Sequence, residues 1–82
     1  MINANTPLDE LESIALNSLN ELHSGEKFLV KELFRGFEWN RITKSNRTKL
    51  GGIFFRYVTE HIELAIEPLG KTPQNQQIYL KK

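Results

Sequence analysis

The chain has 82 residues, of which eleven are basic and ten acidic, with no cysteine and a net charge of +1. This length predicts one small domain whose function must lie on its surface or in a shallow groove. The lack of cysteine excludes a disulfide framework and a thiolate zinc site. The sequence has no long apolar run and no leader of charged and then apolar residues, so we expect a cytoplasmic protein with no membrane partner.

The charges are spread unevenly along the chain. Residues 1–25 hold four acidic and no basic residues, whereas residues 26–82 hold eleven basic and six acidic ones. The segment 35–56 has six basic residues against one glutamate and so carries the whole positive excess. This pattern is typical of a domain that has an acidic surface on one side and, on the other, a basic surface that faces a polyanion.

The first part of the chain predicts an N-terminal helix. Residues 1–5 are interpreted as a flexible polar tail with nothing to hold it. Thr6 and Pro7 predict the start of the helix, because a threonine oxygen can cap free amides and proline suits the first helical position. A one-sided apolar stripe follows as far as residue 22, and Gly25 ends the helix.

The middle of the chain predicts a short strand, a short helix and a connector. Residues 26–30 read as an edge strand, and residues 31–35 as one or two helical turns closed by Gly36. Residues 37–44 form the connector, which contains the only tryptophan, Trp39. This side chain is either a plug beneath the connector or an exposed stacking platform.

Residues 45–61 predict the longest helix. Apolar side chains recur there at spacings of three and four, which places them on one side, toward the core. This stripe consists of Leu50, Ile53, Phe54, Tyr57, Val58 and His61. Gly51 and Gly52 fall on the other sides, and each costs about 1 kcal/mol relative to alanine. The glycine pair therefore indicates either close packing against the first helix or close approach of a nucleic-acid backbone.

The C-terminal part predicts a hairpin of two half-buried strands. Residues 62–67 alternate between apolar and polar or small side chains, and residues 77–81 do the same. In the second strand, Ile78 and Leu80 alternate with Tyr79 and its polar neighbours. The segment between the strands is rich in turn-forming residues and has a polar tip.

The order of these elements is that of a winged helix domain, an α+β fold, over residues 6–82. In this arrangement the two later helices form a helix-turn-helix, the longer one is the presenting helix, and the hairpin is the wing. The connector over residues 36–44 is longer than the turn in the simplest such motifs. This length leaves open whether the two helices cross at the usual angle.

Four pieces of the sequence also carry a resemblance to a known family. They are Lys31-Glu32-Leu33-Phe34, Trp39-Asn40-Arg41-Ile42, Leu50-Gly51-Gly52-Ile53-Phe54 and the segment 70–79. Together they resemble the short domain-of-unknown-function proteins of staphylococcal cassette chromosome elements. The resemblance implies a winged helix fold, preference for single-stranded over duplex DNA, and a role in replication or transfer of a mobile element. It also implies helicase or polymerase proteins of the same element as partners.

Single-strand binding needs cations that hold phosphates and flat side chains on which bases stack. The sequence offers both kinds of residue, and the polar hairpin tip adds amides that can reach phosphates or base edges. The candidate cations are Arg41, Lys44, Arg47, Lys49, Arg56 and Lys71, the candidate stacking residues are Trp39, Phe55 and Tyr79, and the tip amides are Gln74, Asn75 and Gln76.

Two other functions remain open at the level of sequence. One is a transcriptional regulator that reads duplex DNA, although only Asn46 and Arg47 stand ahead of the glycine pair as base-reading side chains. The other is a protein-interaction adaptor of a replication complex, which would use an apolar patch of Trp39, Phe55 and Leu69. We expect no enzyme activity, cofactor or metal, because the two histidines have no ligand or triad partners at suitable spacing.

Overall fold

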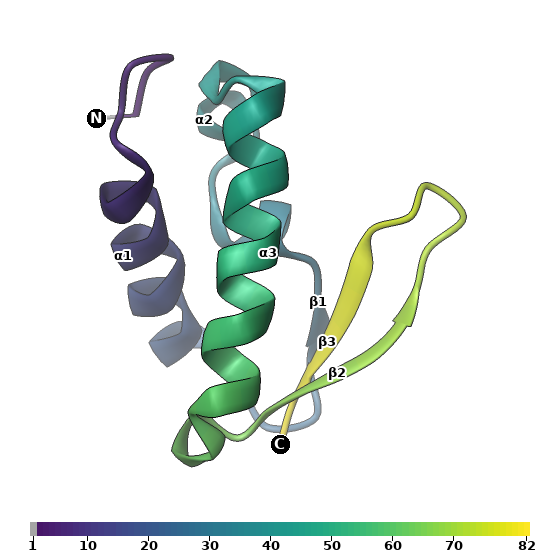
Figure 1. Cartoon of the computed structure of the whole chain (residues 1–82). Helices are drawn as coiled ribbons and strands as arrows, with labels where there is room; N and C mark the ends of the chain where they lie inside the picture. The colour runs from purple at the N-terminus through teal and green to yellow at the C-terminus, as the bar shows by residue number, and fades with distance from the viewer. Residues whose placement is uncertain (1) are drawn as a thin grey trace.

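The computed structural model describes residues 2–82, which form three α-helices and a three-stranded antiparallel sheet (Figure 1). The helices are α1 (Leu8–Ser18), α2 (Gly36–Arg41) and α3 (Lys44–Glu60), and the strands are β1 (Lys27–Phe28), β2 (Ile66–Lys71) and β3 (Gln77–Lys81). Short 3₁₀ turns cover Leu19–Glu21, Val30–Leu33 and Ile62–Leu64. The predicted α+β class is therefore confirmed. No helix within residues 2–82 is long and apolar enough to cross a membrane.

The helix α1 begins without the predicted threonine cap. Its N-cap residue is Pro7, which has no side-chain hydroxyl, and the hydroxyl of Thr6 instead accepts a hydrogen bond from the Asn3 amide at 2.8 Å. Every fourth side chain, Leu11, Ala15 and Leu19, is buried, as the apolar stripe predicted. The α-helix ends at Ser18 and continues only as a 3₁₀ turn, so it is shorter than expected.

The prediction of an unattached tail over residues 1–5 is wrong at Ile2. Its side chain is only 2% exposed and belongs to the hydrophobic core, and its carbonyl oxygen accepts a hydrogen bond from Arg41 Nη1 at 3.3 Å. The Asn3–Thr6 turn directs this short segment back onto the domain. A single apolar residue in a polar stretch has no periodicity, so its burial left no pattern to detect. Met1 lies outside the described residues.

The second helix lies where the sequence predicted a connector. The helical turn predicted over residues 31–35 is present as one 3₁₀ turn, Val30–Leu33, and Gly36 begins α2 instead of closing a helix. Arg35 is the N-cap in extended conformation, and its carbonyl oxygen accepts from the Trp39 amide at 2.9 Å. Only two residues, Ile42 and Thr43, separate α2 from α3. The expected long connector is therefore wrong, since the actual turn is tight.

The helix α3 runs through the middle of the molecule, with α1 packed on one side and the sheet on the other (Figure 1). Its buried residues are Leu50, Phe54 and Val58, which confirms this half of the predicted core stripe. The other three residues, Ile53, Tyr57 and His61, are only partly buried. The ring of Phe54 meets the ring of Tyr79 edge to face at 5.1 Å, and Tyr79 stacks on Phe28 at 5.5 Å. One aromatic cluster thus joins α3 to β1 and β3.

The start of α3 depends on one side-chain cap. Thr43 Oγ1 accepts a hydrogen bond from the Asn46 amide at 3.2 Å, which satisfies a donor that has no partner inside the helix. We expect Thr43→Ala to lower the free energy of unfolding by about 1 kcal/mol. Thr43→Ser, which keeps the oxygen, should recover most of this loss in urea unfolding measured by circular dichroism. Equal stability of all three proteins would contradict the capping role.

The sheet has the order β1-β3-β2, with β1 as the predicted edge strand. Phe28 pairs with Tyr79 on one side of β3, and Pro68 pairs with Tyr79 on the other. Between Pro68 and Lys71 the register shifts, and Gln77 Nε2 braces this bulge by donating to the carbonyl oxygens of Leu69 (2.6 Å) and Gly70 (3.3 Å). A bulge bends its strand, so this brace determines where the hairpin tip lies.

The first strand of the hairpin starts later than predicted. Ile62 is 86% exposed in a 3₁₀ turn, so its expected inward position in a strand is wrong. Ala65 adopts the left-handed conformation (φ 56°) and redirects the chain before β2 begins at Ile66. The strand β2 also ends later than predicted, at Lys71. It includes Pro68 and Gly70, which the sequence placed in the loop.

Candidate nucleic-acid interface

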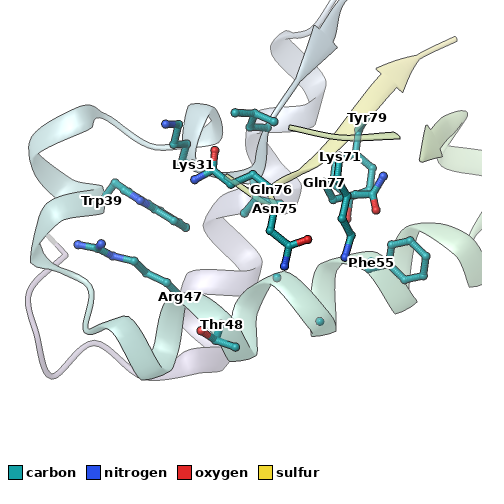
Figure 2. A pocket seen from close by; sticks show the side chains of 14 residues that line it. Lys31, Trp39, Arg47, Thr48, Phe55, Lys71, Asn75, Gln76, Gln77 and Tyr79 are labelled. Atoms are coloured by element: carbon teal, nitrogen blue, oxygen red, sulfur yellow. The ribbon is translucent and has the colours of Figure 1, made fainter. Parts of the chain in front are cut away.

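A groove of about 650 Å³ lies between α3 and the hairpin tip (Figure 2). The N-terminal half of α3 forms its floor, the tip forms one wall, and the segment that follows β1 together with α2 forms the other. The lining residues are Leu29, Val30, Lys31, Trp39, Arg47, Thr48, Gly51, Gly52, Phe55, Lys71, Asn75, Gln76, Gln77 and Tyr79. The groove therefore gathers residues from four separate parts of the chain.

The floor of the groove includes Gly51 and Gly52, in the interior of α3. A Cβ atom built at either position would have no described heavy atom within 4 Å outside its own local helix. Close packing against α1, one of the two explanations offered by the sequence, is therefore wrong. The structure provides no internal contact that requires glycine here, although the pair costs about 2 kcal/mol of helix propensity relative to alanine.

One end of the groove is formed by Trp39 and Arg47 (Figure 2). Trp39 is partly buried, and the centre of its ring lies 5.6 Å from that of Phe34. It is therefore neither fully buried beneath the chain nor a fully exposed stacking surface, the two alternatives that the sequence left open. The Arg47 guanidinium carbon lies 5.5 Å from the centre of the indole, within the range of a cation–π contact. Arg47 Nη2 also donates to the Asn40 carbonyl oxygen at 3.2 Å. These two contacts fix the arginine beside the tryptophan.

The other end of the groove is formed by Phe55 and Lys71 (Figure 2). Phe55 is 42% exposed on α3, although it is a large apolar side chain. Lys71 is exposed at the end of β2, and its side chain reaches from the hairpin toward α3 in Figure 2. Each end of the groove thus combines a flat aromatic ring with a cation.

The hairpin tip is held in one conformation by its own hydrogen bonds. The Thr72 amide donates to the Gln76 carbonyl oxygen at 2.9 Å, the Asn75 amide to the Thr72 carbonyl oxygen at 2.8 Å, and the Gln76 amide to Thr72 Oγ1 at 3.1 Å. Asn75 adopts the left-handed conformation (φ 65°), which asparagine tolerates well. Its side chain points toward α3 (Figure 2). Gln74 is exposed on the tip and does not line the groove.

Tyr79 is a core residue, so its predicted role as an exposed stacking platform is wrong. Its ring is 0% exposed, between Phe28 and Phe54, and it only contributes to the back of the groove. Burial disfavours the phenolate and raises the pKa of Tyr79 to about 12. The strand β3 has apolar side chains at three consecutive positions, so alternation alone did not determine which of them faces the core.

The raised pKa of Tyr79 has a consequence at alkaline pH. The unfolded state loses this proton near the ordinary pKa of 10, whereas the folded state keeps it up to about 12. The contribution of the neutral phenol is therefore complete below pH 10 and is lost as the pH rises toward 12. We expect the free energy of unfolding to fall between these values in the wild type, and to fall less in Tyr79→Phe. Parallel pH profiles from chemical denaturation would contradict this assignment.

The other predicted cations lie outside the groove. Lys49 and Arg56 border a second, shallow hollow of about 390 Å³ together with Leu8, Gly52 and Ile53. Arg41 lies over the ring of Phe37 at 5.0 Å and binds the Ile2 carbonyl oxygen. Lys44 is exposed at the first position of α3 and lines neither hollow.

The groove also contains residues that the sequence did not single out as site residues. Lys31 and Thr48 line it and supply a further cation and a hydroxyl. Gln77 lines it as well, and its side-chain amide holds the hairpin bulge. No spacing rule connects these positions, because they meet only after the hairpin folds beside α3.

The electrostatic character of the groove is positive. Its described lining includes Lys31, Arg47 and Lys71 and no aspartate or glutamate. Within residues 2–82, the ion pairs closer than 4.0 Å are His61–Glu63 and Lys82–Glu67, so none of these three cations is neutralised by a paired carboxylate. The acidic helix α1 lies on the far side of α3 from the hairpin (Figure 1). The groove can therefore attract an anionic ligand.

Comparison with known proteins gives a family match. No curated protein and no solved structure matches the chain significantly. The sequence profile of the family described as Domain of unknown function (DUF1413) matches residues 13–81, which includes every residue of the groove. Because this match spans most of the chain, the protein belongs to the DUF1413 family.

Proposed function

We propose that this protein is a non-catalytic DNA-binding protein that prefers single strands and has little sequence specificity. The groove between α3 and the hairpin is its binding site. The observation that carries this proposal is the combination, in one groove, of two accessible aromatic side chains and three cations without a paired carboxylate. Unpaired bases can stack on Phe55 and on the accessible part of Trp39, while the cations hold phosphates.

The fold we assign to this function is a winged helix. Support comes from the order of elements and from the tight turn of Ile42 and Thr43 between α2 and α3. The hairpin of β2 and β3 corresponds to the wing, since its tip extends beyond the sheet on the side of α3 that faces away from α1 (Figure 1). The wing and the longer helix are the parts of such a domain that contact nucleic acid.

Two features favour single strands over base reading in a duplex. Arg47, the main base-reading candidate at the front of α3, is held against Trp39 and the Asn40 carbonyl oxygen. The next outward positions of α3 include Gly51 and Gly52, which have no side chain with which to read a base. Binding of a single strand needs no base-reading side chain, because any base offers a flat face for stacking and any phosphate attracts a cation.

We further propose that the protein supports replication or transfer of a mobile genetic element, with helicase or polymerase proteins of that element as partners. This part of the proposal relies on the resemblance of four sequence pieces to proteins of staphylococcal cassette chromosome elements. The absence of sequence reading suits such a role, since a replicating element exposes single strands of varied sequence.

The single tryptophan provides a direct test of the site. Trp39 is the only tryptophan and lines the groove, so its fluorescence reports on occupancy. We expect an unlabelled oligothymidylate to quench it in a saturable titration, and a duplex of equal length to do so only at higher concentration. No fluorescence change and no binding with single strands would contradict the proposal. Tighter binding of a defined duplex would favour a transcriptional regulator, and binding of neither form would favour a protein adaptor.

A further inference from the structure

The second hollow lies on a neighbouring face of α3, next to the groove, with which it shares Gly52. Leu8, the first residue of α1, borders this hollow, whereas the hairpin borders the groove. In Figure 1, α1 and the hairpin lie on opposite sides of α3. A ligand that occupied both depressions would therefore have to pass over α3.

The two depressions meet at Gly52, which lines both of them. Its missing side chain leaves open space, because a Cβ there would have no described heavy atom within 4 Å outside its own local helix. The neighbouring Thr48 and Phe55, on the groove side, are exposed. So are Lys49 and Arg56, on the side of the second hollow. At Gly52 no side chain of α3 therefore separates the groove from the hollow.

The charges beyond this crossing point suit a phosphate backbone. Lys49 precedes Gly52 by three residues and Arg56 follows it by four, so both lie one turn of the helix from the crossing. Neither is in an ion pair within the described part of the chain. Among the described residues, the lining of the hollow contains no aromatic side chain. It can therefore hold phosphates but offers no ring on which a base could stack.

We infer that a single strand bound in the groove continues over α3 at Gly52 and into the second hollow, where Lys49 and Arg56 hold its phosphates. This inference rests on the proposed function and extends it from a groove to a path across the domain. The path ends at α1, where Asp9 and Glu10 in the first turn repel further phosphates. A strand that only fills the groove does not reach Lys49 or Arg56.

The test compares oligothymidylates of two lengths. One has about 3 nucleotides, fewer than a typical single-strand binding site covers, and the other has about 12, which lies within the typical range. The variant is Lys49→Ala/Arg56→Ala. The control is Lys27→Ala/Arg35→Ala, which removes the same charge from two exposed residues that line neither depression. Affinity is measured by competition against a labelled strand over a range of salt concentrations.

We expect the variant to bind the long oligonucleotide more weakly, with a slope of log affinity against log salt that is less steep by about 0.7 for each phosphate that the protein no longer holds. It should bind the short oligonucleotide as the control does. An equal loss for both lengths, or a slope that matches the control on the long strand, would overturn the crossing. Failure of the wild type to bind either strand would instead overturn the proposed function itself.

Discussion

Replacing Phe55 by alanine should weaken binding of single-stranded DNA by about 5- to 150-fold, because stacking of a base on an aromatic side chain contributes about 1 to 3 kcal/mol. Phe55 is the most exposed aromatic ring in the groove and lies on the rigid surface of α3. Its side chain is outside the core, so we expect the free energy of unfolding to change by less than about 0.5 kcal/mol. Fluorescence anisotropy and urea unfolding measure the two effects separately.

Phe37→Ala is the matched control for this variant. Phe37 is 51% exposed, close to the 42% of Phe55, but it lies on α2 and does not line the groove. We expect Phe37→Ala to bind with wild-type affinity. Equal losses in both variants would indicate a nonspecific effect of removing exposed rings, and an unchanged affinity in Phe55→Ala would show that the bases stack elsewhere.

The second large effect is expected from Gly51→Ala/Gly52→Ala, in which stability and binding change in opposite directions. The added methyl groups meet no described atom outside their own local helix, so the helix gains about 1 kcal/mol at each position. For a domain of this size, each kcal/mol raises Tm by about 4–8 °C. The same methyl groups occupy the floor over which the strand passes. We therefore expect binding to weaken about tenfold, or about 1.4 kcal/mol, despite the higher stability.

Gly36→Ala serves as the control for the glycine pair. Gly36 is also helical and its Cβ would also point into open space, but it begins α2 and lines neither depression. Its substitution should leave binding unchanged. If the double variant became more stable and still bound with wild-type affinity, no DNA backbone would approach α3 at these positions.

Strong periodicity determined which parts of the fold could be predicted. The stripe on α3 repeats over several turns, so Leu50, Phe54 and Val58 were correctly placed in the core. The helix α2 has six residues and none that is fully buried, so it left no apolar pattern to recognise. Tyr79 was misplaced because its neighbours Ile78 and Leu80 are also apolar.

The candidate site was only partly predictable for a different reason. Charge and aromatic content identified Trp39, Arg47, Phe55 and Lys71, and all four line the groove. The sequence could not separate these residues from cations such as Arg41, which binds the Ile2 carbonyl oxygen on another part of the surface and does not line the groove. That distinction depends on contacts between residues distant in the sequence, which no local spacing encodes.

Binding of single-stranded DNA in the groove is tested most directly by NMR. Amide chemical shifts are mapped during titration with an unlabelled oligothymidylate. We expect the largest changes on the floor and the hairpin tip, at Thr48, Gly51, Gly52, Asn75 and Gln76. Chemical-shift changes confined to α1, or to α2 with none at the groove residues, would contradict binding in the groove. So would an unchanged spectrum at a DNA concentration where another method detects binding.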